Sequence, residues 1–171
     1  RLKGIDFSQA TALKVIGHCA FQHCESMKNV STFPSSLETI GNGAFRHCTG
    51  LEEIDFSQAT ALKEIGEGAF QLCESMKNVS PFPSSLETIG YCAFGNCTRL
   101  KGINFSQATA LKVIGHCAFH RCKSMEVVSP FPSCLGMIGN DAFRHCTRLI
   151  AIDFSQATAL KVIGHCAFQH C

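Results

Sequence analysis

The chain has no excess of charge of either sign and no long hydrophobic run. Its 15 lysines and arginines nearly balance its 13 aspartates and glutamates, which gives a formal net charge of +2 at pH 7. The absence of a basic patch argues against nucleic acid as a main partner. No stretch approaches the ~20 apolar residues that a membrane-spanning helix needs, so no membrane span is expected.

The chain also lacks the signatures of common catalytic sites. It has no glycine-rich phosphate loop, no G-x-S-x-G sequence, and no pair of carboxylates that its repeats would place across a cleft. A cysteine–histidine pair can be drawn almost anywhere among 12 cysteines and 8 histidines, so such pairs carry no information about catalysis. The sequence predicts a protein that is not an enzyme and needs no cofactor.

What the sequence has in abundance is repetition. The motif Ala-Phe-x-x-Cys occurs seven times, with phenylalanines 24 or 25 residues apart at Phe21, Phe45, Phe70, Phe94, Phe119, Phe143 and Phe168. A unit of this length cannot bury its apolar side alone and must stack on its neighbours. The period therefore predicts a solenoid in which each unit forms one rung and the seven phenylalanines form one buried stack.

Two types of unit alternate along the chain. Residues 1–24 and 148–171 are identical at 22 of 24 positions, which indicates growth by copying of a two-unit block. We expect residues 1–171 to form a single array that is a section of a longer one. Because its last rung would expose an apolar end, we also expect head-to-tail self-association of isolated copies.

Within a unit, the apolar positions are few and constant. In residues 37–56 they are Leu37, Ile40, Ala44, Phe45, Cys48, Leu51, Ile54 and Phe56. The short Leu-x-x-Ile segments favour strands, since β-branched residues are frequent there and Gly, Pro or Ser bound them. The glycine that follows each isoleucine, such as Gly41 or Gly115, predicts a turn. Prolines recur once per block and argue against helix, so little helix is expected.

The outward positions support parallel stacking of the rungs. The position after the first leucine reads Lys14, Glu38, Lys63, Glu87, Lys112, Gly136 and Lys161 in successive units. In parallel rungs about 4.8 Å apart, equivalent residues are direct neighbours. Opposite charges would then alternate along the array, so we expect this column to fix the register without forming a binding site.

Residues 37–54 follow the pattern Leu-x-x-Ile-Gly-x-x-Ala-Phe-x-x-Cys-x-x-Leu-x-x-Ile. This pattern, which recurs along essentially the whole chain, resembles the BspA-like class of leucine-rich repeats. The resemblance implies a right-handed, curved leucine-rich-repeat solenoid that is rich in β-structure, with a parallel sheet on its concave side. It also implies adhesion or protein recognition in a cell-surface or secreted protein, and it implies no catalytic residue.

Cysteine is frequent, and its positions fall into two groups. Seven cysteines end the repeated motif and occupy the inward position of the family: Cys24, Cys48, Cys73, Cys97, Cys122, Cys146 and Cys171. A small thiol packs there like an apolar residue, so we expect these thiols to be reduced and shielded. Among the other five, Cys92 and Cys117 fall at equivalent positions of consecutive rungs. They are the best candidates for a disulfide, with free thiols as the alternative.

Histidine stands beside cysteine in the segment from His18 to Cys24, which suggests a zinc site. Equivalent units read Asn42-Gly43 or Glu67-Gly68 at the first His-Cys pair. These positions would then vary freely on the surface, and the ligand set is not closed. The sequence therefore predicts no metal site.

The outward residues that vary most in charge lie in the segment after the motif's cysteine. The candidate protein-binding residues are Lys28, Asn29, Glu52, Glu53, Lys77, Asn78, Lys101, Glu126 and Ile150. A mixed, shallow stripe of this kind favours a recognition or adhesion module, extracellular or at the cell surface, whose partner is a protein ligand or a host or cell-surface component. The alternative is a structural spacer or filament component built from near-identical stacked repeats.

Overall fold

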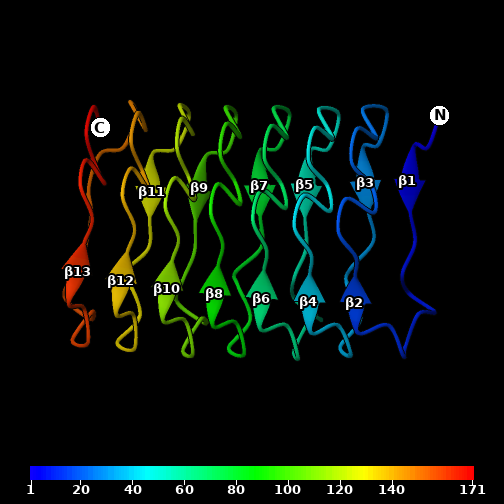
Figure 1. The fold of residues 1–171 in the computed structure, drawn as a ribbon, viewed down its shortest axis with the longest axis horizontal. Coiled ribbons are helices and arrows are strands. Elements are labelled where there is room, and N and C mark those ends of the chain that lie inside the picture. The colour runs from blue at the N-terminus through cyan, green and yellow to red at the C-terminus, as the bar shows by residue number, and fades with distance from the viewer.

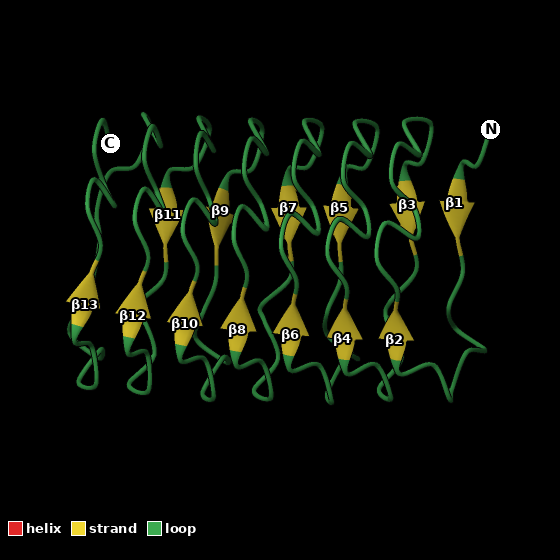
Figure 2. Cartoon of the chain, viewed as in Figure 1, coloured by secondary structure: helices red, strands yellow, loops and turns green.

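The computed structural model describes residues 1–171, which form a stack of rungs with no helix. Each complete rung contributes two short strands, and the two strands run in opposite directions in two separate rows (Figure 1). Turns and loops join the rows at both ends of every rung (Figure 2). The predicted β-solenoid is therefore confirmed, and no helix is available that could cross a membrane.

The strands that contain the isoleucine before the repeated glycine form one seven-stranded parallel sheet, here called the first column. Its members are β2 (Val15–Ile16), β4 (Thr39–Ile40), β6 (Glu64–Ile65), β8 (Thr88–Ile89), β10 (Val113–Ile114), β12 (Met137–Ile138) and β13 (Val162–Ile163). The register pairs Ile16 with Ile40 and Ile40 with Ile65, and the same step continues along the sheet. Equivalent residues of successive units are direct neighbours, as the repeat predicts.

The strands that follow the motif's cysteine form the second column, and this column is interrupted. Its members are β1 (Gly4–Ile5), β3 (Asn29–Val30), β5 (Glu53–Ile54), β7 (Asn78–Val79), β9 (Gly102–Ile103) and β11 (Val127–Val128). They pair only as β1 with β3, β5 with β7, and β9 with β11, and Val127 adds a single bridge to Ala151.

Two stacks of phenylalanine fill the core. Neighbouring rings of the predicted stack, from Phe21 to Phe168, have centroids 5.1–5.4 Å apart, which confirms it. A second stack, spaced 5.2–5.8 Å, consists of Phe7, Phe33, Phe56, Phe82, Phe105, Phe131 and Phe154. Rings of the two stacks meet edge to face, an arrangement that aromatic quadrupoles favour. All 14 phenylalanines thus belong to one continuous core.

The inward cysteines form a regular ladder beside the first phenylalanine stack. From Cys48 to Cys146 they are fully buried, whereas Cys24 and Cys171 in the outermost rungs are less so. Each thiol from Cys48 onward donates to the carbonyl of the motif's phenylalanine one rung earlier, at 3.1–3.3 Å. Burial raises the pKa of Cys48 and of Cys97 to about 12. The inward, shielded position expected for these cysteines is confirmed from Cys48 to Cys146.

The glycine that follows each first-column strand has a second role besides the turn that the sequence predicts. A turn does follow it, but of the 14 glycines only Gly43 and Gly68 have a positive φ, and both lie elsewhere. A Cβ built on Gly115 would lie 2.7 Å from the backbone carbon of Gly90, and most of its equivalents are as crowded. The predicted turn is present, because the carbonyl of this glycine accepts the N–H three residues later, as Gly41 O does from Ala44 at 3.2 Å. Glycine itself is required there by the close approach of neighbouring rungs and not by its φ.

The predicted charge column runs along the outside of the first column. Lys14 Nζ lies 3.1 Å from Glu38 Oε1, and Lys63 Nζ lies 3.7 Å from Glu38 Oε2. The next pair, Lys112 and Glu87, is 2.7 Å apart. All of these side chains are solvent-exposed or partly so, and they support the register as expected.

Candidate functional site

The candidate residues predicted from the sequence lie on the outer surface of the second column, in its strands or directly before them. Lys28, Asn29, Glu53, Asn78, Lys101 and Ile150 are exposed, and Glu52, Lys77 and Glu126 are half-buried. Because the strands stack in register, residues far apart in the sequence form one stripe along the array (Figure 1). We call this surface the strand stripe.

The strand stripe is most positive in its C-terminal half. A shallow groove of about 290 Å³ is lined there by Lys77, Arg99, Lys101, Ser124, Glu126 and Arg148. Two of the cations are paired: Lys77 Nζ is 2.8 Å from Glu52 Oε2, and Arg148 Nη2 is 2.6 Å from Glu126 Oε1. Arg99 and Lys101 form no salt bridge and are exposed. The groove therefore offers two free cations to an anionic group.

Exposed aliphatic side chains occur in the same C-terminal part of the strand stripe. Val127 is 60% exposed and Ile150 is 79% exposed, and Val127 pairs with the exposed Ala151 of the next rung. The equivalent positions of earlier rungs carry polar residues or glycine, such as Lys28, Glu53 or Gly102. Exposed apolar residues thus gather only at the C-terminal end of the strand stripe, and such a patch is a feature of interaction surfaces.

The outward column that follows the second-column strands has a structural role. Asp6 and Asp55 each accept, through Oδ1, the backbone N–H two residues later at 2.8 Å. In the alternate units, Ser31 Oγ accepts the N–H of Phe7, and Ser80 Oγ accepts that of Phe56, both at 2.6 Å. These side chains are engaged by the protein's own backbone, so this column is a strand edge.

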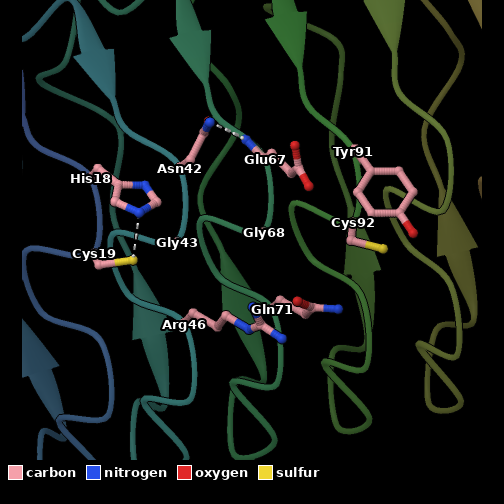
Figure 3. A pocket seen from close by; sticks show the side chains of 10 residues that line it. All are labelled: His18, Cys19, Asn42, Gly43, Arg46, Glu67, Gly68, Gln71, Tyr91 and Cys92. Carbon is pink, nitrogen blue, oxygen red and sulfur yellow. Dashed lines mark hydrogen bonds between the residues drawn. The ribbon is translucent and has the colours of Figure 1, made fainter.

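A second groove, which the sequence analysis did not find, lies over the turns that follow the first column. Its volume is about 370 Å³. Figure 3 shows its lining, which includes His18, Cys19, Asn42, Gly43, Arg46, Glu67, Gly68, Gln71, Tyr91 and Cys92. The groove exists because Gly43 and Gly68 carry no side chain at a position that other rungs fill. Arg46 and Glu67 form no salt bridge, and Tyr91, the only tyrosine, is 50% exposed at its edge.

The position that shapes this groove is constrained in every rung. It reads Cys19, Gly43, Gly68, Cys92, Cys117, Asp141 and Cys166, here called the turn column, and every member has φ between 50° and 62°. Left-handed backbone is uncommon for residues other than glycine. The interpretation that the first His-Cys pair varies freely on the surface is therefore wrong for the turn column, whereas the position before it, represented by His18, is variable and mostly exposed as predicted. Glycine at two of the seven positions was the available signal, because glycine is the residue best suited to this conformation.

Four of the eight histidines form two stacked pairs at the turns. His23 and His47 have ring centroids 4.6 Å apart, and His145 and His170 have centroids 4.7 Å apart. Burial is the first cause that lowers the pKa of His47, followed by the charge of His23. No group of three or more His, Cys, Asp or Glu side chains converges as a metal site requires.

Comparison with known proteins identifies the repeat. A family model described as the BspA type leucine rich repeat region matches residues 1–126 and 63–171. No curated protein matches the chain significantly. Among solved structures, a leucine-rich repeat protein from Bacteroides ovatus is 32% identical with a TM-score of 0.71, over 84% of this chain and 38% of its own.

Two further structures extend the comparison. The T. pallidum leucine rich repeat protein is 28% identical with a TM-score of 0.74, over 86% of this chain and 72% of its own. A leucine rich cell surface protein from Faecalibacterium prausnitzii has a TM-score of 0.65 at 20% identity, over 89% of this chain and 47% of its own, which supports the fold alone. With the repeat pattern, the stacked rungs and the family match in agreement, this chain belongs to the BspA type leucine rich repeat family.

Proposed function

We propose that this array is a non-enzymatic recognition or adhesion module, and that the C-terminal half of the strand stripe is its contact surface. The partner is a protein segment that carries carboxylates and an aliphatic residue. The observation that carries the proposal is the sequence of groups along one stripe: the unpaired Arg99 and Lys101, the exposed Val127 one rung later, and the exposed Ile150 one rung after that.

The chemistry of this surface favours such a partner. Free guanidinium and ammonium groups pair with carboxylates, and arginine can do so through two parallel hydrogen bonds. Burial of exposed Val127 and Ile150 against an aliphatic side chain would add roughly 25 cal/mol for each Å² removed from water. Neither contribution alone distinguishes partners, but together they select a segment that is both acidic and apolar.

A cell-surface or extracellular location is part of the same proposal. Its support is the family, together with the relative from Faecalibacterium prausnitzii that is itself described as a cell surface protein.

The proposal is tested with a displayed library of random peptides selected on the immobilised chain. We expect enriched peptides to contain Asp or Glu near an aliphatic residue. In the double variant Arg99→Glu, Lys101→Glu, the affinity of the best peptide should fall at least about tenfold, which corresponds to 1.4 kcal/mol. Binding should also weaken with added salt, because exposed charge pairs are screened.

The matched control is Lys161→Glu, which reverses an exposed lysine of the first column that lies in no salt bridge. Its affinity for the same peptide should equal that of the parent chain. Ile150→Asp should weaken binding without loss of folded protein, because the side chain is almost fully exposed. Peptides that bind equally well to the parent and to the double variant would rule out the strand stripe as the contact surface.

The second candidate function is a structural spacer or filament component. It is favoured by the near-identity of residues 1–24 and 148–171, since selection for a varied surface would not preserve whole units. Head-to-tail self-association stays a prediction of this alternative. Sedimentation across a concentration series tests it: concentration-dependent association that Arg99→Glu, Lys101→Glu leaves unchanged would favour the spacer.

A further inference from the structure

The turn column has a geometry that bears on its cysteines. Each member lies directly beside the equivalent residue of the next rung, because backbone hydrogen bonds run between rungs at this point. The N–H of Cys19 donates to Asn42 O, and that of Cys92 donates to His116 O, both at 2.9 Å. Since all members share the same left-handed conformation, their side chains leave the backbone in the same direction.

That direction is along the array. Figure 3 shows the sulfur atoms of Cys19 and Cys92 both pointing toward the rung that follows. A Cβ built on Gly43 would lie 3.1 Å from Cys19 Sγ. In a disulfide, the Cβ of one cysteine lies about 3.0 Å from the Sγ of the other, because the S–S bond is about 2.04 Å long. The turn column therefore holds the Sγ of a cysteine at about the distance from the Cβ position of the next rung that a disulfide requires.

Only one pair of neighbours in this column consists of two cysteines. Cys92 is followed by Cys117, whereas Cys19 is followed by Gly43, and Cys166 follows Asp141. The Cys92 and Cys117 thiols are close enough that each affects the pKa of the other. Cys92 is buried and Cys117 is half-buried, so a small oxidant reaches Cys117 first.

We propose that Cys92 and Cys117 are a modification site, which closes to a disulfide between neighbouring rungs on reaction with a low-molecular-weight disulfide such as oxidised glutathione. The Cys117 sulfur, after loss of its proton, attacks the glutathione S–S bond, and one glutathione thiolate leaves. The Cys92 sulfur then loses its proton and attacks Cys117 Sγ, and the second glutathione thiolate leaves. The two protein thiols give up two electrons, and both protons end on the two reduced glutathione molecules.

The closed bond would join two rungs at the C-terminal wall of the groove in Figure 3. It would also restrain the unfolded chain by closing a loop between residues 92 and 117. This inference does not depend on the proposed contact surface, which lies on the second column.

The test is oxidation of the reduced 171-residue chain in a glutathione buffer rich in the oxidised form, followed by alkylation, digestion and mass spectrometry. We expect a Cys92–Cys117 cross-linked peptide in most molecules, and only glutathione adducts or free thiols at Cys19 and Cys166. Cys117→Ser should abolish the cross-link. Gly43→Cys should create a second cross-link, to Cys19, because position 43 already has the φ of the cysteines in this column.

Several outcomes would overturn the proposal. One is separate glutathione adducts on Cys92 and Cys117 in folded protein, and another is persistence of both thiols while Cys19 reacts. A cross-link of Cys92 to any other cysteine, with native circular dichroism retained, would contradict it as well. If Cys117→Ser does not fold, the Gly43→Cys cross-link still tests the column geometry, and its absence would count against the proposal.

Discussion

The first column repeats Leu-x-x-Ile in every unit, whereas the second alternates Leu-x-x-Ile with Met-x-x-Val, and only the first column forms a continuous sheet. In the first column, the glycine N–H of each rung donates to the isoleucine carbonyl of the preceding rung at 2.8 Å, from Gly41 to Gly164. In the second column, the corresponding bond alternates. Ser31, Ser80 and Ser129 donate to the preceding rung at 2.9–3.0 Å, whereas the N–H groups of Asp55, Asn104 and Asp153 have no backbone partner.

The two unit types explain the alternation. In one type, an Asp or Asn side chain accepts the N–H two residues later, which bends the chain away from the sheet directly after the strand. In the other type, a serine stays in the ladder and its Oγ holds the phenylalanine N–H of the preceding rung. The comparison teaches that the same glycine after every strand maintains the first sheet, while alternation of Ser with Asp or Asn after the strand interrupts the second.

The largest expected effect concerns the core that the two columns share. Phe94 belongs to the first phenylalanine stack and Phe105 to the second, and both are fully buried. Phe94→Ala and Phe105→Ala should each lower the free energy of unfolding by about 3–5 kcal/mol, measured by chemical denaturation. An equal loss of unfolding free energy in the two variants would show that the columns differ in their sheets and not in their cores. A Phe105→Ala variant as stable as the parent would break the assignment of the second stack.

The next effect tests the close approach of rungs in the first column. Residues 13–21 and 111–119 have the same sequence, but a Cβ on Gly17 meets nothing within 4 Å, whereas one on Gly115 meets backbone at 2.7 Å. Gly115→Ala should therefore cost about 3 kcal/mol of stability as an overpacking change. Gly17→Ala in the same chain should change stability by less than about 0.5 kcal/mol. The two variants are compared by thermal unfolding, and similar melting temperatures would contradict the close approach of rungs at Gly115.

The smallest effect concerns the charges that border the first column. The hydrogen bond and charge of Lys14, with the charge of Lys63, lower the pKa of Glu38 below its ordinary value of 4.5. A lowered carboxyl pKa contributes stability that is present above pH 4.5 and is lost as the pH falls below it. Glu38→Gln should therefore melt slightly below the parent at pH 7 and equal to it near pH 3 in low salt. Glu64→Gln is the control, because Glu64 is exposed and forms no ion pair. Its melting temperature should equal that of the parent at both pH values.

Much of this architecture could be predicted from the sequence, because residues at equivalent positions of the repeat become direct neighbours when the rungs stack. The Phe94 stack, the Cys97 ladder and the Glu38 charge column all follow from regular spacing. The second phenylalanine stack was missed because its members are alternately 26 and 23 residues apart, as from Phe7 to Phe33 to Phe56. The groove in Figure 3 was missed because it depends on left-handed backbone at Gly43 and Gly68, which spacing alone does not reveal.

The candidate residues of the strand stripe were found by their variation in charge, and the structure places them on one surface. Sequence reasoning did not find Arg99 and Arg148, because they stand before the strand and outside the two positions that vary. The approach of Arg148 to Glu126 depends on how neighbouring rungs stack, which is a property of the fold and not of any single unit.

Amide hydrogen exchange measured residue by residue by NMR tests the difference between the two columns most directly. The account predicts uniformly slow exchange for the first-column glycines Gly66, Gly90 and Gly115. In the second column it predicts an alternating pattern, in which Ser80 and Ser129 exchange slowly and Asp55 and Asn104 exchange faster by at least about tenfold, since only the first two amides are bonded. Equal protection of Ser80 and Asn104, or exchange of Gly90 as fast as that of Asn104, would contradict it.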